Sequence, residues 1–124
     1  MEKDRLSGFL YRRLVGATVN SGRGLRHALL TEEAFQVYVF LSVLLVPLAF
    51  IIAADYVQLI LLFGSILLVL ITELLNTAVE AVVDRVGLDR HELSGRAKDM
   101  GSAAVSLSII LFFVVWGIVV AENF

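Results

Sequence analysis

The sequence contains no cysteine, a single proline and few charged residues. Without cysteine there is no disulfide framework, no thiolate nucleophile and no zinc or iron–sulfur site built on sulfur. One proline, with no repeats and no Ser/Pro-rich stretch, argues against linkers, so we expect a single domain over residues 1–124. A formal net charge of −2 also lacks the basic surface that binds a phosphate backbone, which excludes nucleic acid as a partner.

Hydrophobic residues are what the chain has in excess. They make up 59% of its 124 residues, whereas charged residues make up only 18%. An ordinary globular domain is about half apolar and about a quarter charged. A chain of this length has too little interior to hide so much apolar surface from water, so most of that surface must face lipid or partner subunits. The composition predicts a membrane protein.

Three segments are candidates for transmembrane helices: residues 35–54, 56–83 and 101–121. The first is free of charge, and about 20 residues at about 1.5 Å each match the ~30 Å hydrocarbon core of a bilayer. The second keeps its helical periodicity beyond its apolar part, so we expect it to project from the membrane. The third helix is expected to begin before its span, near Ser94. The predicted fold class is an all-α membrane protein.

Residues 1–30 form a charged leader with an apolar arc at helical spacing. This pattern predicts an amphipathic helix that lies in the membrane interface. The glycines at 22–24 are expected to break it. Arg13 falls inside the apolar arc, where its side chain either snorkels to lipid headgroups or faces a bound anion.

The basic residues indicate an orientation. All ten precede residue 35 or lie between residues 84 and 100, and the turn at Asp55 and the C-terminal tail carry none. The positive-inside rule therefore places the N-terminus and the second connector in the cytoplasm. Every candidate for phosphate chemistry then lies on the side where ATP is found.

A stripe of polar residues runs along the end of the second span. Its members fall within an arc of about 100° on a helix; they are Glu73, Asn76, Thr77, Glu80 and Asp84. Carboxylates at a membrane span are functional candidates by default, although polar contacts between helices are the structural alternative. Glu73 and Glu80 lie about 10 Å apart along the axis, too far to share a proton. They therefore suit separate roles, one near a reacting hydroxyl and another on a metal.

The chemistry of this stripe favours magnesium. Carboxylate and amide oxygens without sulfur ligands, joined by Glu32 or Glu33, suit Mg²⁺ held together with substrate phosphates. In the connector, Lys98 is the candidate phosphate partner, and it shares a polar face with His91, Ser94, Gly95 and Ser102. Small residues recur at Ala97, Gly101 and Ala104, which permits close contact between helices.

The run from Glu73 to Val105 resembles the prokaryotic integral-membrane diacylglycerol kinase family. The resemblance rests on the spaced series of Glu73, Asn76, Glu80 and Asp84, followed by Ala97-Lys98-Asp99. It extends to Glu32-x-Ala34-Phe35 and, more loosely, to Arg13 and Gly24-Leu25-Arg26. The chain differs from the family mainly in its leader and early first span, where aromatic residues are replaced by Asn20, Gly22 and Leu29, and polar ones by Val37 and Tyr38.

The resemblance implies a homotrimer in the bacterial inner membrane, with active sites shared between subunits at the cytoplasmic boundary. The implied reaction is transfer of a phosphoryl group from MgATP to diacylglycerol, giving ADP and phosphatidic acid. Glu73 would be the general base, Glu32 and Glu80 would hold Mg²⁺, and Asn76 and Asp84 would support them. The implied nucleotide contacts are Arg13, Asn20, Glu32, Glu80, Asp89, Arg90, His91, Lys98 and Asp99. The implied contacts with the lipid substrate are Arg13, Glu73, Ser102 and Trp116.

Two other functions compete with this interpretation. Relatives in the same superfamily phosphorylate undecaprenol, although the stretch from Arg90 to Asp99 is more similar to the diacylglycerol branch. A proton- or cation-coupled transporter could use Glu73 and Glu80 as a relay. Residues 57–71 contain no ionisable group, so such a relay would have no group to carry a proton or cation across half of the membrane.

Overall fold

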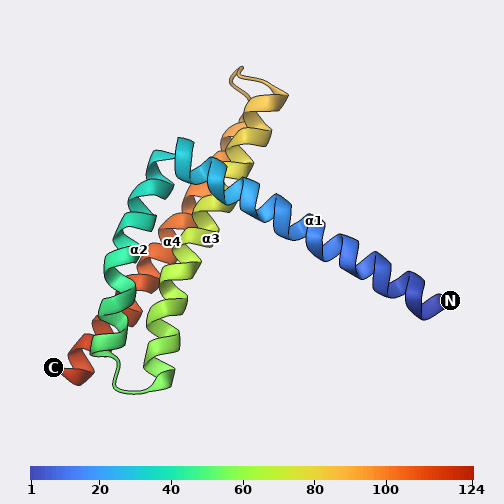
Figure 1. Cartoon of the computed structure of the whole chain (residues 1–124). Helices are drawn as coiled ribbons and strands as arrows, with labels where there is room; N and C mark the ends of the chain where they lie inside the picture. Colours follow the sequence, from blue (N-terminus) through green and yellow to red (C-terminus); the bar gives the residue numbers. More distant parts are fainter. The chain divides into compact units, whose positions relative to one another are not determined.

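The computed structural model describes all residues from 1 to 124, and every regular element is a helix (Figure 1). The helices are α1 (Glu2–Thr31), α2 (Glu33–Ile52), α3 (Tyr56–Val86) and α4 (Glu92–Asn123). The chain forms two compact units, residues 1–36 and residues 37–124. The first unit contains α1 and the start of α2, and the second contains the rest of α2 together with α3 and α4.

The N-terminal unit is built on one unbroken helix. α1 runs through Gly22 and Gly24 to Thr31, so the expected break at residues 22–24 is wrong. Neither glycine has a positive φ. A glycine within a helix costs only about 1 kcal/mol relative to alanine, which the helix formers on either side can offset. The helix ends at Glu32, whose backbone is extended, and Gln36 Nε2 then donates to the carbonyl oxygen of Leu29 at 3.0 Å.

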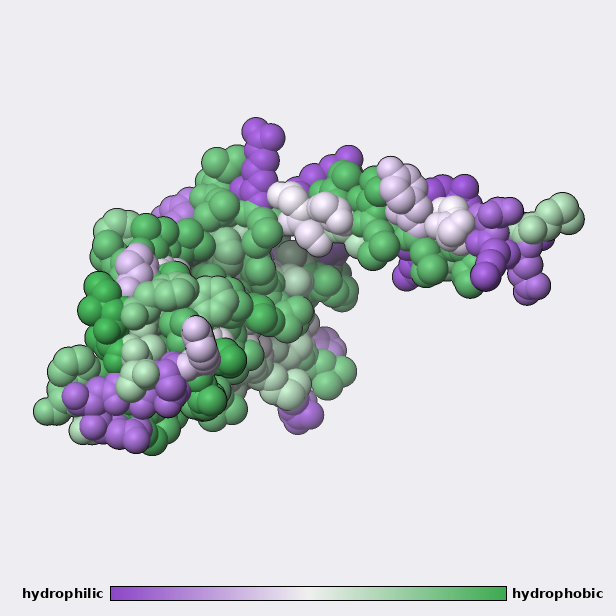
Figure 2. All heavy atoms as spheres, turned by 60° about the horizontal axis from the view of Figure 1, so that its bottom comes forward, coloured by the Kyte–Doolittle hydropathy of each residue, from purple (hydrophilic) through white to green (hydrophobic).

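Three helices are long and apolar enough to cross a membrane, and they are α2, α3 and α4. The predicted spans at 35–54, 56–83 and 101–121 fall on these helices. α4 begins at Glu92, slightly before the predicted start near Ser94. Figure 2 shows that hydrophobic residues cover most of the visible surface of the helical bundle. This is the surface expected of helices whose outer faces meet hydrocarbon.

Side-chain caps set where α3 and α4 begin. Asp55 precedes α3, and its Oδ1 accepts from the backbone N–H of Gln58 at 2.8 Å. His91 precedes α4, and its Nδ1 accepts from the backbone N–H of Leu93 at 3.1 Å. Each cap satisfies a donor at the first turn that has no partner within the helix. The caps therefore fix the two connectors that separate the three long helices.

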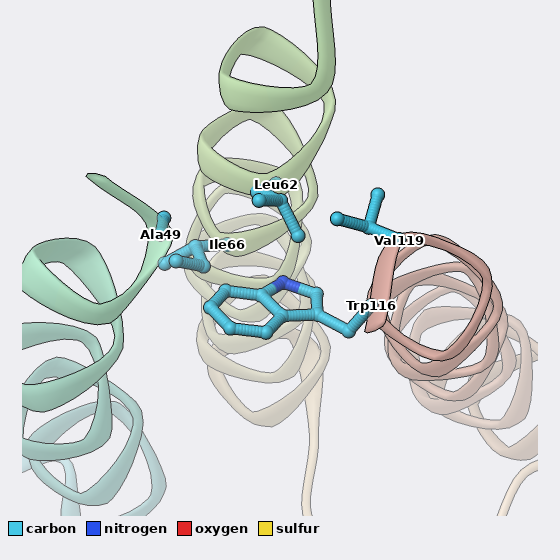
Figure 3. Close-up of a cluster of buried hydrophobic side chains, with 5 residues drawn as sticks. All are labelled: Ala49, Leu62, Ile66, Trp116 and Val119. Carbon is cyan, nitrogen blue, oxygen red and sulfur yellow. The ribbon is translucent and has the colours of Figure 1, made fainter. Parts of the chain in front are cut away.

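The core of the second unit lies between α2, α3 and α4 (Figure 3). Its buried residues are Ala49, Leu62, Ile66, Trp116 and Val119. The indole ring of Trp116 reaches from α4 towards α3, where its Nε1 donates to Ser65 Oγ at 3.2 Å. Phe112 stacks on the same indole with ring centroids 5.3 Å apart. These contacts join α4 to α3 in the apolar part of the bundle.

A polar cluster ties the helix ends together beside Asp55. Gln58 is 9% exposed, and its Oε1 accepts from the backbone N–H of Ala54 and from Asn123 Nδ2, both at 2.8 Å. Asn123 Nδ2 also donates to the carbonyl oxygen of Ile52 at 2.7 Å. Within the bundle, the hydroxyls of Thr72 and Ser108 lie 2.9 Å apart and link α3 to α4. These polar groups are thus held by partners on neighbouring helices.

Truncating the best-buried side chain tests this packing. Leu62 is fully buried, so Leu62→Ala leaves a cavity between the helices and is expected to lower the free energy of unfolding by about 2 kcal/mol or more. The measurement is reversible unfolding in mixed detergent micelles. Ile60→Ala on the same helix is the control, because Ile60 is 68% exposed. Equal losses in the two variants would contradict the packing described here.

Candidate active site

The polar stripe of α3 begins at a buried carboxylate. Glu73 is 7% exposed, although it follows an apolar stretch of the helix. The phenol group of Tyr38, on α2, interacts electrostatically with the Glu73 carboxylate. Thr72, the preceding residue, is held against Ser108 of α4 by the hydrogen bond described above. The packing of α3 between its two neighbours therefore holds this carboxylate at a defined place inside the bundle.

The next turns of α3 place an amide beside a second carboxylate. Asn76 Nδ2 donates to Glu80 Oε1 at 3.4 Å. Asn76 Oδ1 is buried and has no hydrogen-bond partner, and it packs directly against Gly101 of α4. The Glu80 residue itself is exposed. The structure thus brings together Asn76, Glu80 and Gly101, all three of which the sequence points to.

An ion pair joins the far end of α3 to the start of α4. Lys98 Nζ lies 2.7 Å from Asp84 Oδ1, with the two side chains 43% and 49% exposed. At this exposure the pair contributes little to stability, because water screens the attraction. Its consequence is geometric, since it holds one cationic group at a set place beside the connector.

A hollow of about 440 Å³ surrounds this ion pair, large enough for a small-molecule ligand. Five of the predicted site residues line it: Asp84, Asp89, Arg90, His91 and Lys98. Ser94 and Gly95 complete the wall on α4. Helical spacing in the sequence predicts that both share one face with Lys98. The sequence carries no signal that His91 Nδ1 caps α4, because a cap depends on local backbone geometry.

Other predicted residues lie outside this hollow. Asp99 and Ser102 are exposed on α4 and do not line it. Trp116 is 8% exposed in the core, where packing and its hydrogen bond to Ser65 occupy it. The roles of these three residues towards nucleotide or lipid stay predictions.

Three predicted residues belong to the N-terminal unit. Arg13 is exposed, and its guanidinium carbon lies 5.8 Å from the ring centroid of Phe9, one turn earlier on α1. This is a cation–π distance, which explains how an arginine is accommodated within an apolar arc. Asn20 is exposed on α1, and Glu32 is the half-buried residue at its end.

An apolar groove of about 160 Å³ was not foreseen from the sequence. It lies between α2, α3 and α4, and its wall includes Tyr38, Leu41, Ile66, Val69 and Phe112. Tyr38 connects it to Glu73, with which it interacts electrostatically. Membrane helices are apolar on all sides, so no periodicity marks the residues that line such a groove.

The donor atoms of the stripe suit a hard cation. Glu80, Asn76 and Asp84 offer carboxylate and carboxamide oxygens, and the chain has no cysteine thiolate that would favour a softer metal. The single chain holds no group of three or more histidine or acidic side chains arranged around one point. Any divalent cation here would therefore draw further ligands from elsewhere, as Mg²⁺ does when it binds with phosphates and water.

Comparisons with known proteins show the family of this chain. A family model described as prokaryotic diacylglycerol kinase matches residues 19–120. A diacylglycerol kinase of Haemophilus influenzae is 48% identical over 104 residues, which cover 84% of this chain and 88% of the relative. One from Escherichia coli K12 is 45% identical over 114 residues, covering 92% and 93%, and one from Helicobacter pylori is 36% identical over 107 residues, covering 86% and 84%. The chain belongs to the prokaryotic diacylglycerol kinase family.

Proposed function

We propose that this chain is a membrane lipid kinase that transfers the γ-phosphoryl group of MgATP to the hydroxyl of diacylglycerol, giving phosphatidic acid and ADP. The observation that carries the proposal is the buried carboxylate of Glu73, on a helix face that leads through Asn76 and Glu80 to the hollow at Lys98. Membership of the family supplies the reaction. The proposed site has its acceptor end at Glu73 on α3 and its phosphate end at Lys98 on α4.

At the acceptor end, Glu73 is the general base. Its role is to accept the proton of the lipid hydroxyl as that oxygen attacks the γ-phosphorus. The groove beside Tyr38 has the apolar lining that an acyl chain requires, and Ser42 gives it a further polar group. Arg13, Ser102 and Trp116 are the additional lipid contacts that we propose. Because Glu73 lies near the apolar groove, it can contact the hydroxyl of a diacylglycerol whose acyl chain occupies the groove while the hydroxyl remains at the membrane boundary.

At the phosphate end, Lys98 neutralises charge on the transferred group, which is the main requirement of phosphoryl transfer. The nucleotide occupies the hollow, with Asp89, Arg90 and His91 at its wall and Arg13, Asn20 and Asp99 as further contacts. Glu32 and Glu80 are the residues that would hold Mg²⁺, supported by Asn76 and Asp84. When bound, the metal supplies charge neutralisation and alignment of the phosphates.

The assembly that we propose is a homotrimer in the bacterial inner membrane, with its N-terminus in the cytoplasm and α1 as the amphipathic interfacial helix. Support comes from the exposure of Glu80 and Asp84 on the single chain, because charged groups near a bilayer are expected to face a partner or a cavity. Sites shared between subunits would enclose them. The oligomer is measurable as the native mass of the protein in detergent.

The decisive experiment is transfer of radiolabelled phosphate from ATP to a panel of lipid alcohols by the purified protein, with and without Mg²⁺. We expect labelled phosphatidic acid from diacylglycerol, and no transfer without the metal. Preference for undecaprenol at equal surface concentration would move the chain to the other branch of the superfamily. Absence of transfer to every alcohol would contradict the proposal, and proton flux without ATP consumption would favour a transporter.

Replacing the base tests its role directly. Glu73→Gln keeps the shape of the side chain but removes the proton acceptor, so kcat is expected to fall by about 10² to 10⁴. ATP binding, measured by equilibrium titration, should persist. Glu122→Gln, at the exposed C-terminal end of α4, is the matched control and should retain normal turnover. Near-normal turnover of Glu73→Gln would mean that another group is the base.

Substitutions at two basic residues of α4 distinguish a specific phosphate contact from an effect of the protein's net charge. Lys98 lines the hollow, whereas Arg96 pairs with Glu92 one turn earlier in the helix and does not line it. Loss of a charge-assisted contact of about 1.5 to 3 kcal/mol predicts that Lys98→Met raises the KM for ATP about ten- to hundredfold. Arg96→Met should leave it near normal. Equal increases in the two variants would show that only the net charge matters.

A further inference from the structure

Gly101 of α4 lies directly against Asn76, a member of the polar stripe of α3. A Cβ atom added there would clash with Asn76 Oδ1, because the two atoms would be nearer than real Cβ contacts come. The backbone is less crowded, since the same Cβ would lie 3.7 Å from Asn76 Cα, an ordinary van der Waals contact. The missing side chain of Gly101 therefore makes room for the carboxamide of Asn76 rather than for the helix backbone.

The seated carboxamide has one favourable orientation. Its oxygen faces Gly101, and its nitrogen donates to Glu80 Oε1 at 3.4 Å. The reversed orientation would turn the amide oxygen towards a carboxylate oxygen, and two acceptors repel each other. Thus the fit against Gly101 also decides which atom of Asn76 meets Glu80.

The surroundings of the contact are small and open. Ala97 and Ala104 lie one turn to either side of Gly101, and with Thr72 and Val79 they line a hollow of about 350 Å³ at the surface between α3 and α4. A displaced Asn76 side chain can enter that space. An added methyl group at Gly101 would thus move the carboxamide before it separates the helices.

We propose that Gly101 is a positioning residue for phosphoryl transfer: its lack of a side chain seats the carboxamide of Asn76, which in turn holds the carboxylate of Glu80 in place. This inference rests on the proposed function for the role of Glu80. It concerns a residue that does not itself contact substrate. Small residues on helix faces usually serve close packing alone, and the contact with a functional side chain is what distinguishes Gly101.

The test is Gly101→Ala in the purified full-length protein. Displacement of catalytic groups by about 1 Å is expected to lower kcat about ten- to hundredfold, with little change in the KM for diacylglycerol. The thermal unfolding temperature should stay equal or rise, because alanine favours a helix over glycine. Gly117→Ala is the matched control on the same helix, since its added Cβ meets nothing within 4 Å, and it should keep normal kcat.

A double-mutant cycle and an NMR spectrum distinguish a positioning role of Gly101 from a role in helix packing alone. With Asn76→Ala in place, adding Gly101→Ala should lower kcat no further, because the displaced group is gone. The side-chain amide resonances of Asn76 in ¹⁵N-labelled protein should shift in Gly101→Ala and not in Gly117→Ala. That shift can be measured whether or not the protein phosphorylates diacylglycerol, so failure of the proposed function is distinguishable from failure of this inference.

Several results would overturn the proposal. They are an unshifted Asn76 amide in Gly101→Ala, a kcat within twofold of the wild type, or losses that multiply fully in the double variant. If Gly101→Ala alone does not fold, recovery of folding in the double variant supports the contact with Asn76. Failure of both variants to fold would show that the glycine serves helix packing instead.

Discussion

The close packing of α3 against α4 is the constraint on which the rest of the structure depends. These helices meet through Trp116 and Ser65 in the apolar core, through Thr72 and Ser108 further along, and through Lys98 and Asp84 at their charged ends. Each contact lies at a different depth, so together they fix both the rotation and the register of the two helices. In that register the polar stripe of α3 faces the part of α4 that carries Lys98, and the proposed phosphoryl transfer requires this facing arrangement.

Polar groups in the apolar part of the bundle are satisfied by partners on other helices, as lack of water there demands. The clearest exception is Asn76 Oδ1, which is buried without a hydrogen bond. An unsatisfied acceptor lowers stability, and such local conflicts are expected where function rather than folding selects the residue. The exception lies on α3 between the buried carboxylate of Glu73 and the exposed carboxylate of Glu80.

The sequence predicted the long-range outline well, because that outline depends on hydrophobic length and helical period. The three spans and the shared face of Glu73, Asn76 and Glu80 follow from these two quantities. Rules based on local sequence failed where tertiary or capping contacts determine the helix boundaries. α1 continues through Gly22 and Gly24, and His91 caps a helix. The apolar groove and the burial of Trp116 were also beyond prediction, since an all-apolar helix carries no signal of which side faces a neighbour.

The ion pair between Lys98 and Asp84 has a consequence for selectivity. An anion that enters the hollow meets a lysine already engaged with a carboxylate, so the anion competes with Asp84 for that lysine. Free phosphate or an acidic headgroup brings nothing to compensate that carboxylate. A nucleotide accompanied by a divalent cation does compensate it. Lys98 would then pair with the phosphates and Asp84 with the cation, so neither charge would lack a partner. Under the proposed function, a hollow neutralised in this way favours a nucleotide that carries its own cation over a naked anion.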